Sequence, residues 1–125
     1  MFTGPIHKIE AEISQSRKKL SALPRYHPLR PICASRLGFW LLESYWLSKQ
    51  KDDLDKAIMY LAESLLSPPV PWLAWSPINP EVLFELALSL LVRSRDPKEP
   101  EDAIYAAIYL RYLRDSVYKP FVFRR

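Results

Sequence analysis

An internal repeat is the feature that most constrains this 125-residue chain. The stretch Leu-Asp-Lys-Ala-Ile at 54–58 returns as Pro-Glu-Asp-Ala-Ile at 100–104, a spacing of 46 residues, and in the same register Leu42 corresponds to Leu88. A unit of this length holds two antiparallel helices with their loops, and such units bury their apolar faces against one another. The spacing therefore predicts an all-α fold, a short α-solenoid of antiparallel helix pairs with about five helices.

Composition and charge set the broad class of protein. Hydrophobic residues make up 49% of the chain, which is enough apolar material for a core. No stretch approaches the roughly 20 apolar residues that span a bilayer, and the N-terminus lacks the basic and then apolar pattern of a secretory signal. Cys33 is the single cysteine, which agrees with a reducing compartment. We therefore expect a cytoplasmic protein without a membrane span.

Prolines and caps place the helix ends. Pro24 stops the first helix and Pro31 suits the first position of the second, while Asn79 followed by Pro80 is a clear start signal. We expect a single domain over residues 1–125, made of a half repeat (5–23), repeat one (31–66), a loop rich in proline and tryptophan (67–79), repeat two (80–115) and a tail (116–125).

Individual residues add predictions about packing. Gly38 inside the second helix costs about 1 kcal/mol relative to alanine, and close approach of another helix would compensate for it. The acidic pairs Asp52-Asp53 and Glu101-Asp102 precede or open helices, where a carboxylate caps backbone N–H groups or complements the helix dipole. We expect both pairs to serve as helix caps, and we expect Cys33 to be a small core residue.

Several residues of repeat one resemble the tetratricopeptide (TPR) repeat family. Ala57-Ile58, Leu61, Ser64 and Pro69 resemble the pattern of its second helix, and Leu37-Gly38 with Leu41 resembles the first. The linker between the two is longer than usual and is similar to that of the long-linker repeats in fungal TPR arrays. The resemblance covers about residues 8–115 and is weaker in repeat two, where Phe84 replaces the glycine. It implies a right-handed solenoid of two and a half TPR-like repeats.

The sequence offers little material for catalysis or for a cofactor. Its two histidines, His7 and His27, have no cysteine or acidic partner at metal-ligand spacing, and the two glycines cannot form a phosphate-binding loop. Nothing marks Cys33 as a nucleophile. We expect no enzymatic activity, no cofactor and no metal site.

The expected function is protein binding. A solenoid of this kind serves as a non-catalytic interaction module or scaffold that binds a peptide or partner domain in the groove along its first-type helices. Carried over from the family by position, the resemblance implies a partner-binding groove lined by Ser35, Phe39, Leu42, Glu43, Glu81, Glu85, Leu88 and Ser89.

Two alternatives come from other features of the chain. Fewer than three complete repeats and an apolar fifth helix suggest a self-associating fragment of a larger array, a homo-oligomer in which Trp72 and Trp75 are possible interaction aromatics. The local excess of basic residues between Arg17 and Arg36 suggests attraction of phosphates or of an acidic partner. Electrostatic binding of nucleic acid or of an acidic membrane by this cluster is the weakest of the alternatives, and nucleic acid is an unlikely partner.

Overall fold

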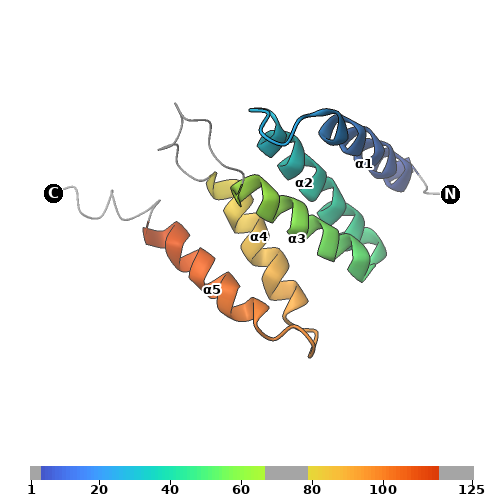
Figure 1. Cartoon of the computed structure of the whole chain (residues 1–125). Coiled ribbons are helices and arrows are strands. Elements are labelled where there is room, and N and C mark those ends of the chain that lie inside the picture. Colours follow the sequence, from blue (N-terminus) through green and yellow to red (C-terminus); the bar gives the residue numbers. More distant parts are fainter. Residues whose placement is uncertain (1–3, 67–78, 116–125) are drawn as a thin grey trace. The chain divides into compact units, whose positions relative to one another are not determined.

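A computed structural model describes residues 4–66 and 79–115 of the chain, and within these residues it contains five α-helices and no strand (Figure 1). The predicted all-α class and the order of five helices are confirmed. The chain divides into two compact units, residues 1–77 and 78–125. The tail, Trp72, Trp75 and all of the predicted loop except Asn79 lie outside the described residues.

The first unit contains three helices: α1 (Gly4–Ala22), α2 (Arg30–Ser48) and α3 (Lys51–Leu66). Helix α2 lies between the other two and packs against both (Figure 1). Its apolar residues cover more than one side of the helix, and Leu37 and Leu41 are fully buried. Ala34 and Leu42 of α2 are also buried, and α1 and α3 complete the core with Ile9, Leu20, Leu54, Ala57, Ile58 and Leu61. An apolar surface on both sides of α2 therefore sets the three-helix order.

Gly38 allows α2 and α3 to approach each other closely. A Cβ atom at this position would lie 2.8 Å from Cγ and 2.9 Å from Cδ2 of Leu61, and 3.3 Å from the carbonyl oxygen of Ala57. These distances are shorter than ordinary van der Waals contact between carbon atoms. The predicted close approach of another helix at Gly38 is confirmed, and the neighbour is α3.

The second unit contains α4 (Pro80–Arg93) and α5 (Asp102–Leu113), which pack against each other. The predicted start of α4 is confirmed, because the side chain of Asn79 accepts hydrogen bonds from the backbone N–H groups of Glu81 (2.9 Å) and Val82 (3.4 Å). Among the described residues of this unit, the buried apolar ones are Val82, Leu83, Leu86, Ala87, Leu90 and Ala106. Five of these six residues belong to α4, so α5 contributes little to the core.

The pair α2–α3 and the pair α4–α5 correspond in burial at a spacing of 49 residues. At the sequence spacing of 46, Leu42 is 4% exposed whereas Leu88 is 36% exposed. At 49, small residues that are buried coincide: Gly38 corresponds to Ala87, and Ala57 to Ala106. Three residues turn a helix by about 300°, so the two registers place the core stripe about 60° apart around the helix. Matching residue types therefore gives a register of 46 residues, whereas matching buried positions gives a register of 49 residues.

Two of the acidic residues predicted at helix starts also bind a neighbouring helix. The carboxylate of Asp53 accepts a hydrogen bond of 2.7 Å from the hydroxyl of Ser44, near the end of α2. The carboxylate of Asp102 accepts bonds of 2.6 and 3.1 Å from the guanidinium of Arg93, the last residue of α4. Both carboxylates lie in the first turn of their own helix, as expected for acids that complement the helix dipole, and each also meets a donor from the preceding helix. Asp53 and Asp102 also lie 49 residues apart, as do Ser44 and Arg93.

No helix in the described part of the chain is long and apolar enough to cross a membrane.

Candidate functional site

One hollow in the first unit is a groove between α1 and α2 with a volume of about 380 Å³. That volume lies toward the lower end of the range for small-ligand pockets, roughly 300–1,000 Å³, and leaves room for a few side chains. The lining residues of the groove are Glu12, Gln15, Ser16 and Lys19 of α1 with Ile32, Cys33, Arg36, Phe39 and Trp40 of α2.

Helix α2 supplies the apolar wall of the groove. Phe39 and Trp40 are half-buried, and the side chain of Ile32 is 52% exposed. Half-buried aromatic rings can gain contact area from a ligand while they keep a fixed position against the helix. Cys33 is also half-buried and lines the groove, so the expectation that it is a core residue was wrong. It stands one turn before Leu37, on the edge of the core stripe.

Helix α1 supplies a polar wall that is charged at both ends. Glu12 and Lys19 are seven residues apart, which corresponds to about 10 Å along a helix axis. Arg36 faces the same groove from α2. Among the residues that the structure describes, neither Lys19 nor Arg36 has an ion pair or a side-chain hydrogen bond. Both cations are exposed, so they are available to a ligand.

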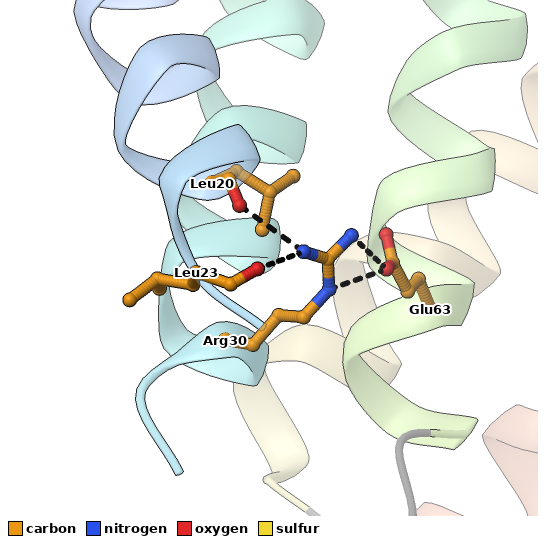
Figure 2. A network of polar contacts seen from close by, with 4 residues as sticks. All are labelled: Leu20, Leu23, Arg30 and Glu63. Atoms are coloured by element: carbon orange, nitrogen blue, oxygen red, sulfur yellow. Dashed lines mark hydrogen bonds and ion pairs between the residues drawn. The ribbon is translucent and has the colours of Figure 1, made fainter. Parts of the chain in front are cut away.

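Arg30, by contrast, has its guanidinium fully engaged (Figure 2). It donates to the carbonyl oxygens of Leu20 (3.1 Å) and Leu23 (3.0 Å) at the end of α1, and through two nitrogens to Oε1 of Glu63 in α3 (3.1 and 3.0 Å). A helix end leaves its last carbonyl groups without intrahelical partners, and Arg30 satisfies one of these as well as the carbonyl that follows the helix. The network ties α1, α2 and α3 together near the Lys19 end of the groove.

The predicted groove residues of the first unit have different environments. Phe39 lines the groove, whereas Glu43 is exposed and is not among the lining residues. Ser35 and Leu42 are buried, and the hydroxyl of Ser35 donates to the carbonyl of Ile32 (2.9 Å). Buried side chains offer little surface to a partner in this conformation. Phe39 is therefore the predicted residue that belongs to the groove observed here.

The predicted groove residues of the second unit are also divided. Glu81 and Leu88 are exposed and Glu85 is half-buried, but Ser89 is 1% exposed and its hydroxyl donates to the carbonyl of Glu85 (2.7 Å). A single groove formed by α2 and α4 remains a prediction, because the two units are described separately.

Eight of the nine lining residues were not identified as a binding site in the sequence, although two of them belong to the basic cluster noted there. Within that cluster Arg17, Lys18 and Arg25 are exposed outside the groove, Arg30 is engaged in its network, and Lys19 and Arg36 line the groove. The local excess of basic residues was the one available signal. It could not distinguish a cation that supports the fold from one that faces a hollow.

A second hollow of about 230 Å³ lies at the opposite end of the first unit, with Ile6, Ile9 and Leu47 among its lining residues. Its acidic residue Asp53 already accepts the hydroxyl hydrogen of Ser44, and Glu10 is exposed. Across residues 4–66 and 79–115, no group of three or more His, Cys, Asp or Glu side chains is placed to hold a metal ion.

No protein family, curated protein or solved structure matches this chain.

Proposed function

We propose that this chain is a protein-interaction module whose first unit binds a short peptide segment in the groove between α1 and α2. The observation that carries the proposal is the juxtaposition in one hollow of a half-buried aromatic wall, Phe39 and Trp40, with the exposed cations Lys19 and Arg36, which have no ion pair among the described residues. Apolar walls provide affinity and a few placed polar groups provide orientation, which is the usual construction of a ligand site.

We also propose that the two helix pairs are TPR-like repeats of a short right-handed solenoid. Support comes from the motif resemblance in repeat one and from the 49-residue correspondence of Gly38 with Ala87 and of Ala57 with Ala106. Small buried residues at matched positions allow close packing of the two helices of each pair. Repeat modules of this kind act by binding, and function still has to be argued from the site.

The test is peptide selection on the purified chain. A random peptide library displayed on phage is selected on the wild type, and the enriched peptides are synthesised and titrated against three proteins: the wild type, Phe39→Ala and Met59→Ala. Met59 is an exposed apolar residue of α3 that does not line the groove. We expect the Phe39 variant to bind about tenfold or more weakly, as for a central aromatic contact, and the Met59 variant to bind like the wild type. Equal affinities for all three proteins would refute the groove.

Self-association through α5 is a second candidate function, favoured by one observation. Ile104, Tyr105, Ile108 and Tyr112 are each between 46% and 62% exposed, and they recur at intervals of three and four residues, so they form one stripe. A stripe of large apolar residues on one helix is typical of an interface. We propose that a second copy of the chain covers it.

Light scattering during size-exclusion chromatography at several concentrations tests this candidate. We expect a dimer that dissociates on dilution, and the double variant Ile104→Gln/Ile108→Gln should be a monomer of about 14.6 kDa at every concentration. A wild-type chain that stays monomeric at high concentration would remove the candidate.

A further inference from the structure

We infer that the groove between α1 and α2 recognises an acidic peptide, one in which an aspartate or glutamate lies two or three positions from a large apolar residue. This inference rests on the proposed function and specifies its ligand. The acidic side chain would bind to Lys19 and Arg36, and the apolar one would pack against Phe39 and Trp40.

The charges of the groove support an anionic ligand. Its lining contains two cations and one acid, and the two cations have no partner within the described residues. A guanidinium binds a carboxylate through two parallel hydrogen bonds, and an ammonium adds a compact charge beside it. Arg30 and Arg93 illustrate the contrast, since each is already bonded to a carboxylate of its own unit.

The arrangement along the helices supports the spacing of the two ligand groups. Helix α1 runs antiparallel to α2, so Lys19 lies toward the start of α2, and Glu12 toward Phe39 and Trp40. The distance of about 10 Å from Lys19 to Glu12 along α1 equals about three residues of an extended peptide. Glu12 would repel an acid at the aromatic end, which fixes the direction in which the peptide lies.

A peptide suits the groove better than a nucleic acid. A nucleic-acid strand presents a phosphate at every nucleotide and needs a basic track along its path. In this groove the carboxylate of Glu12 stands about 10 Å along α1 from Lys19. Two cations and one apolar wall match a ligand with one localised negative charge and one apolar group.

Three immobilised peptide libraries of equal length provide the test. They share the same apolar positions and differ only in the residue three positions away, which is Asp or Glu, Asn or Gln, or Lys or Arg. The wild type is compared with the groove variant Lys19→Glu/Arg36→Glu and with the control Arg17→Glu/Lys18→Glu. The control carries the same change in net charge on two exposed residues of α1 outside the groove. The fold of each variant is checked by its helical circular dichroism and melting temperature.

We expect the wild type and the control to bind members of the acidic library at least about tenfold more tightly than the matched amide peptides. We expect the groove variant to lose this preference and to favour the basic library. Equal loss of binding in the groove variant and in the control would overturn the inference, because it would indicate long-range attraction. Equal affinity of the wild type for acidic and amide peptides would also overturn it.

The failure of this inference can be distinguished from failure of the proposed function. If Phe39→Ala weakens binding to all three libraries while charge reversal changes nothing, peptide binding stands and the acidic class is wrong. If a single-stranded oligonucleotide displaces the acidic peptides and binds more tightly than they do, the ligand class is phosphate, and the inference is likewise wrong.

Discussion

The guanidinium of Arg93 binds the carboxylate of Asp102 through two hydrogen bonds, of 2.6 and 3.1 Å, and so joins the end of α4 to the start of α5. Both side chains are largely removed from solvent, Asp102 the more completely. Within the described residues Ala106 is the one buried apolar residue of α5, and this ion pair adds a buried polar contact between α5 and α4.

Replacing Asp102 with alanine should destabilise the second unit by about 3 kcal/mol, since it leaves the guanidinium of Arg93 in a poorly solvated site without its carboxylate. Hydrogen exchange of the α5 amides measures the effect, together with urea denaturation. The control is Glu101→Ala, which removes the neighbouring carboxylate, an exposed group that makes no capping hydrogen bond, and should change stability by less than about 0.5 kcal/mol. Similar losses in the two variants would show that the ion pair adds nothing specific.

Replacing Gly38 with alanine should also destabilise the chain. Alanine improves helix propensity by about 1 kcal/mol, but the new methyl group would overlap Leu61 and crowd the backbone of Ala57. Overpacking of this severity costs about 3 kcal/mol, so we expect a net loss of about 2 kcal/mol in the free energy of unfolding. Urea denaturation followed by circular dichroism measures it, with Ser14→Ala on the exposed side of α1 as the control. A stabilised Gly38 variant would mean that α3 can move away without loss.

Replacing Arg30 with lysine should cost about 2 kcal/mol although the charge is retained. A lysine ammonium cannot reach two carbonyl oxygens and a carboxylate in the fork geometry that Arg30 uses (Figure 2). The matched control is Arg36→Lys, the same substitution at an exposed residue without a partner in the described residues. Thermal unfolding compares the two variants, and equal melting temperatures would contradict the structural role of Arg30.

The backbone conformation of Lys49 has a cost that two substitutions can measure. It ends α2 in the left-handed region with φ of 60°, a conformation that costs a non-glycine residue about 1 kcal/mol. Its ammonium also lies 5.0 Å from the ring centre of Trp46 and 5.7 Å from that of Tyr45. Lys49→Gly and Lys49→Ala both lose this cation–π contact, but only glycine relieves the backbone. The glycine variant should therefore be about 1 kcal/mol more stable than the alanine variant by urea denaturation.

The sequence was informative where a residue type has one strong local meaning. Asn79 before Pro80 indicated a helix start, and Gly38 inside an apolar helix indicated close packing. It was less informative about side chains whose role depends on residues distant in the chain. Asp53 and Asp102 suited helix caps equally well in sequence, and only the fold places Ser44 and Arg93 beside them.

The groove and the packing register could not be read from the sequence for the same physical reason. Lining residues such as Gln15 and Arg36 carry no motif, and they form a site only because α1 packs along α2. The register of 46 residues follows chemical similarity, whereas burial follows the angle around the helix axis. The two registers differ by three residues. The register of 46 places Leu88 at the centre of the apolar stripe, whereas in the structure it lies at the exposed edge of that stripe.

The network of Arg30 has a consequence for how occupancy of the groove would be transmitted. One wall of the groove ends at the carbonyl oxygens that Arg30 holds, and the same guanidinium is held by Glu63 of α3. Ligand binding in the groove and attachment of α3 are linked through Arg30, and such linkage is reciprocal. A ligand that pulls α1 and α2 together therefore also strengthens the attachment of α3. Helix α3 supplies none of the groove's lining residues and would nevertheless report its occupancy, as slower amide exchange around Glu63.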